Sequence, residues 1–219
     1  MSLMPIFSPA AAAVLSVAYV TKVKEVTNDT TSHTLSSVAL GAAAADRQIL
    51  VNAYASMDAV AIITGVTIGG VSATEFVVNN ASGKSSGFYM ASVPSGTTGD
   101  IVISINTGTG ELWGAAVYRI TGGAATSASD TASYNTSTSP ATLTISCPAG
   151  GAIFAGGLHN DGGTAVWAEI TELWDEAMSG AQKWTGAWDE FDTQQTDLAV
   201  TATLGSVSMS FTACSIEKA

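Results

Sequence analysis

The chain has 219 residues, of which 47% are hydrophobic and 11% are charged, and its formal net charge is −11. This apolar content is enough for a substantial core and excludes a chain that is disordered by composition. The seven basic residues are scattered along the sequence. They therefore do not form the clustered Lys and Arg patch that a nucleic-acid partner requires.

The N-terminal segment is apolar but interrupted by proline. Met4, Ile6 and Phe7 are spaced around Pro5, and a second proline, Pro9, follows. Because proline blocks regular strand pairing, we expect residues 1–13 to form an arm that contacts a partner subunit rather than the chain's own core.

The first residues also resemble targeting segments in part. Ser8 followed by Pro9 is typical of a helix N-cap and first helical position, which predicts one short helical turn. The apolar stretch 10–20 is not preceded by Lys or Arg, which argues against a secretory signal. It is also too short to span a membrane, so no membrane partner is expected.

Strand-like runs recur after the arm, and sustained helical periodicity is absent. The pattern predicts an all-β fold, an antiparallel, jelly-roll-like β-sandwich. The expected strands are Val14–Thr27, Gln48–Ala55, Gly65–Ile68, Thr74–Val78, Gly87–Val93, Asp100–Ile105, Leu112–Thr121, Thr131–Asn135, Ala141–Cys147, Ala152–Gly157, Ala165–Met178, Gln182–Phe191, Leu198–Leu204 and Val207–Ile216.

Turn residues separate these runs. Ser179-Gly180 suits a tight hairpin between two Trp-bearing strands. The Gly-, Ser- and Thr-rich stretch Thr121–Pro140 divides the chain in two. A linker between two domains is one alternative for this stretch. We interpret it instead as a surface loop or weak edge strand inside one domain, residues 14–219, because each part alone has few large core residues.

Four phrases carry a resemblance to a known family: LGAAAADRQILVNAY (Leu40–Tyr54), VTIGGVSAT (Val66–Thr74), VPSGTTGDIVIS (Val93–Ser104) and VYRITG (Val117–Gly122). In these phrases and in their order, the chain resembles small β-sandwich virion proteins of tailed bacteriophages. The resemblance covers about half to two-thirds of the chain.

The resemblance implies a virion component, either a head decoration (cement) protein or a small tail or spike protein, with no catalytic residues to carry over. The sequence shows no heptad repeat, collagen-like run or long shaft, which fibres generally need to trimerise. A compact sandwich with an arm therefore favours an exterior capsid decoration protein.

Four tryptophans, Trp167, Trp174, Trp184 and Trp188, fall within 165–191. Strand alternation predicts that Trp174 shares a face with Glu172 and Glu176, and Trp184 with Trp188 and Glu190. We expect these indoles to be core or interface anchors, with at least one of Trp174, Trp184 and Trp188 buried only on assembly. The alternative is an exposed sugar-binding platform beside carboxylates.

Half of the carboxylates cluster late in the chain: Asp161, Glu169, Glu172, Asp175, Glu176, Asp189, Glu190, Asp192 and Asp197. Calcium binding and glycoside hydrolysis are open alternatives for such a cluster, but the Asp-x-Asp-x-Asp spacing of a calcium loop is absent. A solvated acidic rim is the expected arrangement, and no metal site is assigned.

Other reactive side chains lack companions. Gly83–Gly87 matches Gly-x-Ser-x-Gly, but a strand rather than a helix follows it, so a polar hairpin loop is expected instead of a nucleophile elbow. His33 and His159 are expected at the surface. Cys147 and Cys214 are expected as buried thiols, because two cysteines make neither a disulfide framework nor a zinc site. The alternative is a single disulfide that links two late strands.

The resemblance implies a virion protein, and with the other sequence features we expect it to be non-enzymatic, without cofactors and located on the exterior of a phage particle. Its expected partners are the major capsid protein or other virion proteins, and further copies of itself in a homo-oligomer. The alternative is a tail or head spike or a carbohydrate-binding adhesion module that uses residues 165–191 on host polysaccharide.

Overall fold

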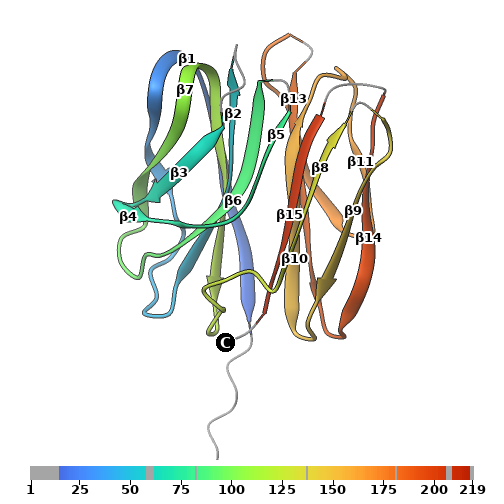
Figure 1. The fold of residues 1–219 in the computed structure, drawn as a ribbon. Helices are drawn as coiled ribbons and strands as arrows, with labels where there is room; N and C mark the ends of the chain where they lie inside the picture. The colour runs from blue at the N-terminus through green and yellow to red at the C-terminus, as the bar shows by residue number, and fades with distance from the viewer. Residues whose placement is uncertain are drawn as a thin grey trace, which may run out of the picture.

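In a computed structural model, the described residues are 15–57, 62–81, 83–136, 138–180, 182–205 and 209–217. All regular structure among them is β-strand, and every pair of neighbouring strands is antiparallel. The predicted all-β, antiparallel sandwich class is confirmed. Figure 1 shows the strands stacked in four layers.

The strands are β1 (Ser16–Ala39), β2 (Gln48–Met57), β3 (Ile63–Ile68), β4 (Val71–Ser72), β5 (Thr74–Ala81), β6 (Lys84–Ser92), β7 (Thr98–Thr121), β8 (Asp130–Thr136), β9 (Ala141–Cys147), β10 (Gly151–His159), β11 (Val166–Ala168), β12 (Thr171–Ala177), β13 (Lys183–Phe191), β14 (Gln195–Thr203) and β15 (Met209–Ile216).

The first part of the chain forms one sheet that folds over on itself. The long strands β1 and β7 pair with each other from end to end, with register irregularities where they bend. The outer half of β7 pairs with β3, which in turn pairs with β4. The inner half of β7 pairs with β2, and the sheet continues to β6 and β5. Apolar side chains of the two halves, such as Leu35, Ile103, Val51 and Trp113, enclose the first core.

The second part forms a sandwich from separate sheets. An inner sheet has the order β12-β13-β10-β15-β8, and an outer sheet has the order β11-β14-β9. Their facing side chains, including Ile145, Val200, Ile153 and Phe211, form the second core.

A third group of side chains, here called the middle core, lies between the two inner sheets. The first part contributes Tyr54, Phe88 and Tyr118, and the second contributes Phe154 and Trp184. The aromatic rings contact one another directly; those of Tyr118 and Phe154, for example, lie 4.9 Å apart. Large aromatic surface therefore holds the two parts of the chain together.

Several strands differ from expectation in ways that have local causes. β1 continues to Ala39, through a polar stretch where Thr31 and Ser37 take positive φ values of 72° and 53°. The predicted strand Ala165–Met178 is split into β11 and β12 at Glu169, which has a φ of 73°. The edge strand expected within Thr121–Pro140, by contrast, is present as β8, which pairs with β15 at the edge of the inner sheet.

Candidate functional site

Arg47 is fully buried at the start of β2 and binds backbone carbonyls of two loops. Its Nε donates to Val93 O at 2.6 Å, Nη1 to Gly41 O at 2.8 Å, and Nη2 to Ser95 O at 2.8 Å. Burial lowers the pKa of Arg47, and the Arg119 charge adds to this. The guanidinium nevertheless stays charged at neutral pH, because its ordinary pKa is above about 12.

Neighbouring contacts tie further loops to the same place. The Asp46 carboxylate accepts a hydrogen bond from Gly122 N at 2.7 Å, and this N–H is the main reason why the pKa of Asp46 is lowered. Arg119 Nε donates to Ala42 O at 2.8 Å, and Gly69 N donates to Asp100 O at 2.8 Å. We call residues 40–47, 69–70, 93–100 and 119–122 the Arg47 loop cluster.

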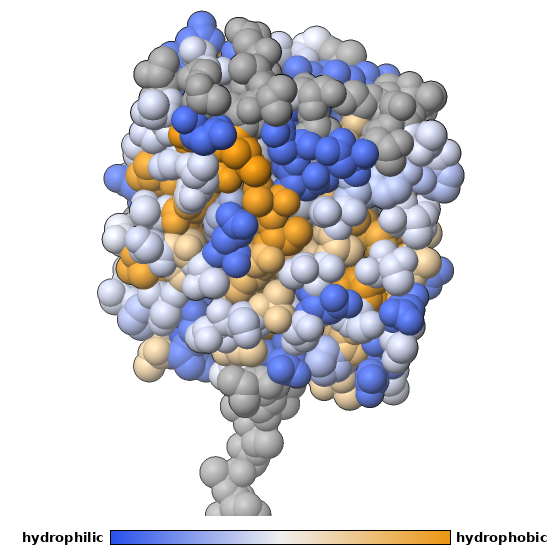
Figure 2. Space-filling view, viewed as in Figure 1, coloured by the Kyte–Doolittle hydropathy of each residue, from blue (hydrophilic) through white to orange (hydrophobic). Residues whose placement is uncertain are grey.

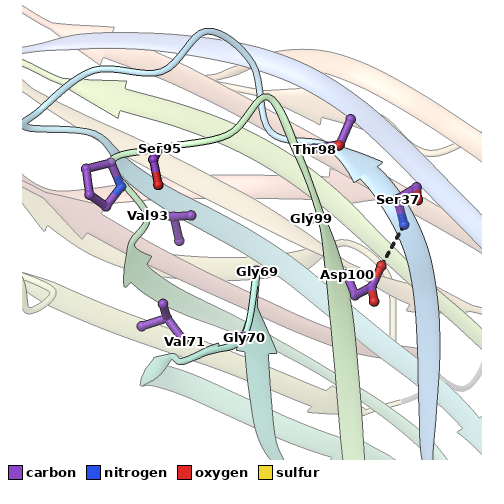
Figure 3. A pocket seen from close by; sticks show the side chains of 10 residues that line it. Ser37, Gly69, Gly70, Val71, Val93, Ser95, Thr98, Gly99 and Asp100 are labelled. Atoms are coloured by element: carbon purple, nitrogen blue, oxygen red, sulfur yellow. Dashed lines mark hydrogen bonds between the residues drawn. The ribbon is translucent and has the colours of Figure 1, made fainter.

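A hollow of about 480 Å³ opens beside this cluster, as Figure 3 shows. It is lined by Ser37, Gly69, Gly70, Val71, Val93, Pro94, Ser95, Thr98, Gly99 and Asp100. Gly69 and Gly70 both have positive φ, 58° and 80°, which the tight turn between β3 and β4 requires. The turn holds Val71, which is 40% exposed, at the rim.

The lining of the hollow is mostly backbone, hydroxyl and small apolar groups. Among the described lining residues, Asp100 alone has an ionisable side chain. It accepts a hydrogen bond from Ser37 N at 2.8 Å, which holds the end of β1 against β7. A nucleophile paired with a base is not among these lining groups. A hollow with such a lining offers hydrogen-bonding groups and small apolar contacts to a polar loop or side chain.

The arm residues named from the sequence, Met4, Ile6 and Phe7, lie outside the described residues, as does the Ser8-Pro9 turn. The described chain begins beside the loop cluster, because Ser16 pairs with Thr121 and the next residue, Gly122, binds Asp46.

Two of the tryptophans named from the sequence lie in the middle core. Trp184 is fully buried and Trp174 is 4% exposed, with ring centroids 5.3 Å apart. Gly186 makes room for this pair, since a Cβ there would lie 2.1 Å from Trp174 Cζ2. Both indoles are covered by the chain itself, so they offer no face to a sugar or a partner.

Trp188 is different. It is only partly buried, and its ring stacks on Phe154 with a centroid distance of 6.0 Å. It packs on the same core as Trp184, which confirms that these two indoles share a face. As a partner-binding residue, Trp188 stays a prediction. The fourth indole, Trp167, is 8% exposed in the second core.

The expected common face of Glu172 and Trp174 is wrong. A β-bulge between these residues shifts the register, so Glu172 lies opposite Ala187, a residue of the second core, whereas Trp174 points into the middle core. An extra residue in one strand reverses the alternation beyond it.

The late carboxylates are engaged separately rather than as one site. Their described partners are Gly205 N for Asp161, Lys183 for Asp175, Lys22 and Lys24 for Glu176, Thr171 for Asp189 and Val17 N for Glu190. Lys24 and Lys22 lower the pKa of Glu176. Across the described ranges, no three His, Cys, Asp or Glu side chains form a group that could hold a metal ion.

The expectation that both histidines are surface residues is wrong. His159 is fully buried beside Asp175, whose Oδ1 lies 3.5 Å from its Nε2. Burial lowers the pKa of His159, and Asp175 opposes this only in part. His33 is 8% exposed, stacks on Trp113, and lies 2.5 Å from Asp29 and 3.0 Å from Glu25.

Gly83–Gly87 is also not the polar hairpin loop that we expected. Lys84, Ser85 and Ser86 belong to β6 and are buried. Ser86 Oγ donates to Ser210 O at 3.1 Å, and Ser85 Oγ accepts from Ile63 N, so both hydroxyls have structural partners. The cysteine prediction is confirmed: Cys147 and Cys214 are free and buried.

One face of the body shows exposed apolar surface. Figure 2 shows it gathered where β3, β5 and β6 lie in Figure 1. The edge strand β5 contributes the partly buried residues Phe76, Val77 and Val78. The sequence predicted neither this surface nor the hollow beside Arg47. Both depend on which distant loops lie side by side, and turn residues in a sequence do not show that.

No family model, curated protein or solved structure matches the chain. Within the described part of the chain, no helix has the length and apolar character needed to cross a membrane.

Proposed function

We propose that the chain is a non-catalytic structural protein of a tailed-phage virion that decorates the exterior of the head by binding the major capsid lattice. One observation carries this proposal. The four sequence phrases that resemble virion proteins are far apart in the chain, yet they meet in the Arg47 loop cluster.

Isolated turn motifs arise in many unrelated sandwiches, so scattered matches would carry little weight. Here the phrases depend on one another. Arg47 of the first phrase binds Val93 and Ser95 of the third, Asp46 binds Gly122 of the fourth, and Gly69 of the second binds the third through Asp100. A set of interlocking contacts supports inheritance of one structural unit.

The same end of the body would supply the docking surface. The hollow beside Val71, the loops of the cluster and the departure point of the arm at Ser16 lie together there. A partner at this end would meet a rigid surface and the apolar arm at once. On a lattice, many such modest contacts would add up through repetition.

The competing proposal, a carbohydrate-binding module, needs exposed aromatic faces. Trp174 and Trp184 are buried in the middle core and Trp167 in the second core, which leaves Trp188 as the one partly accessible indole of that segment. This placement favours the structural role over the sugar-binding role.

Quantitative mass spectrometry of purified virions, separated into heads and tails, tests the proposal. A decoration protein should be present in heads at a copy number comparable with that of the capsid subunits. A few copies confined to tails would support the spike alternative instead, and absence from both fractions would overturn the virion role.

A further inference from the structure

The two parts of the chain have the same strand order. The inner sheet of the first part reads β1-β7-β2-β6-β5, and that of the second reads β8-β15-β10-β13-β12, so strands match in chain order. The outer sheets match as well: the outer halves of β1 and β7 with β3 correspond to β9, β14 and β11. Each of the long strands β1 and β7 of the first part therefore corresponds to two separate strands of the second part: β8 and β9 for β1, and β14 and β15 for β7.

Sequence details mark the same correspondence. β5 begins with Thr74-Glu75 and β12 with Thr171-Glu172, and each pair is followed by a register shift against the next strand. The hairpins that follow both turn through Ser-Gly, with positive φ at Gly83 and Gly180. Bulges are specific features of a fold, so a bulge at the same step indicates common construction.

The correspondence can be followed residue by residue across the inner sheets, by going from each residue to its partner on the next strand. The first-part series of paired residues is Asn79, Ser86, Tyr54, Gly114 and Lys24. The second-part series is Glu176, Trp184, Leu158, Ser210 and Asn135. Lys24 of the first part therefore corresponds to Asn135 of the second, and Asn80 corresponds to Ala177.

These corresponding residues make corresponding contacts between the two parts. Lys24 Nζ donates to Ala177 O at 2.5 Å, and Asn135 Nδ2 donates to Asn80 O. Each part thus offers the same donor position and the same acceptor position to the other. Reciprocity of this kind defines an isologous, two-fold interface.

The centre of the interface shows the same symmetry. Asn52 of β2 and Gly156 of β10 are corresponding residues, because their partners Phe88 and Gly186 correspond. They face each other: a Cβ on Gly156 would lie 2.6 Å from Asn52 Oδ1. At a two-fold axis, a residue meets its own counterpart.

We propose that the chain is two copies of one sandwich unit, residues 16–121 and 130–216, which dock through a self-complementary inner face about a two-fold axis parallel to the strands. The axis has this direction because the order of strands is reversed between the facing sheets: β1 lies on β12, where Tyr19 stacks on Trp174, and β5 lies on β8. The partner that fits each inner face is a second copy of the unit. This pairing goes beyond the proposed virion role and does not depend on it.

Cutting the full chain at two matched sites tests the unit boundary. One variant carries a protease site between Thr126 and Ser127, and the control carries it between Gly162 and Gly163. All four residues that flank the two sites are exposed. After cleavage, unfolding in urea and dilution, the first pair of fragments should reassociate with native circular dichroism. The second pair should recover about fivefold less, because the cut then divides the second unit between the two fragments. Equal recovery of the two pairs would overturn the proposal.

A circular permutant tests the axis. By the same strand pairing, Thr121 corresponds to Glu217, and Asp130 corresponds to Ala18. If the axis is two-fold, the distance from Thr121 to Asp130 therefore equals the distance from Glu217 to Ala18. A copy of Gly122–Ser129 should therefore join residues 130–217 to residues 18–121 in reversed order. The permutant should melt within about 5 °C of the unpermuted chain 18–217. A permutant that stays unfolded while this control folds would contradict the two-fold arrangement.

Discussion

The indole N–H of Trp184 donates to Oδ1 of Asn52 across the middle core, at 3.1 Å. Asn52 is fully buried, and its Nδ2 donates to Gly87 O at 3.2 Å. A single amide thus satisfies a buried indole and links the two facing sheets. Since buried donors without partners are costly, this contact helps to fix how the sheets meet.

Asn52→Ala should lower the free energy of unfolding by about 1–3 kcal/mol, because the Trp184 N–H would lose its acceptor in the core. Urea unfolding followed by tryptophan fluorescence measures the change. Ser127→Ala, at an exposed position, is the control and should leave the unfolding midpoint in place. If both variants unfolded at the wild-type midpoint, the hydrogen bond between Trp184 and Asn52 would not contribute to stability.

Arg47→Lys should destabilise the chain by about 2–4 kcal/mol, because one ammonium cannot reproduce the planar fork that reaches carbonyls in two loops. The matched control is Arg119→Lys, which removes a guanidinium with one described hydrogen bond, to Ala42 O, at the edge of the same cluster. In thermal unfolding, the melting temperature of Arg47→Lys should be well below that of Arg119→Lys. The reverse ranking would show that the buried guanidinium does not hold the cluster.

The buried His159 predicts a pH dependence of stability. Burial lowers its pKa in the folded chain, so near its ordinary pKa of about 6.5 the unfolded chain binds more protons. The free energy of unfolding should therefore fall as the pH drops through this value. His159→Gln should show a shallower fall between about pH 7.5 and pH 5.5 in urea titrations. Parallel pH profiles for the two proteins would rule out this role of His159.

Deletion of Met1–Ser8 should abolish attachment to heads while the melting temperature stays almost unchanged, because these residues are expected to contact a partner. Val26→Ser is a control at an exposed apolar residue ten positions beyond Ser16 on β1, and should attach normally. Co-sedimentation and differential scanning calorimetry give the two readouts. A large loss of melting temperature with attachment retained would place the arm in the chain's own core.

Local sequence pattern predicted the strands that alternate cleanly. Ala141–Cys147 was predicted with its observed bounds, because inward Leu143 and Ile145 alternate with polar residues. The outer half of β1 was missed because its polar run from Asn28 resembles a loop. That stretch is a strand because β7 supplies its hydrogen-bonding partner, which lies about 70 residues away.

Placement of the polar side chains was beyond local pattern. His33 and His159 are buried because residues of distant strands pack on their rings, Trp113 on His33 and Phe211 on His159. The four clustered tryptophans indicated a packing role, but the bulge after Glu172 decided which face Trp174 occupies. The Arg47 loop cluster required four segments to meet, which only the assembled sheets determine.

The most direct test of the proposed role is titration of the purified chain onto phage heads that lack it, with bound protein measured after sedimentation. Binding should saturate at a fixed ratio to the capsid subunits, and added host polysaccharide should not compete. If the chain failed to bind heads yet bound the polysaccharide, with Trp188→Ala abolishing that binding, the decoration role would be contradicted.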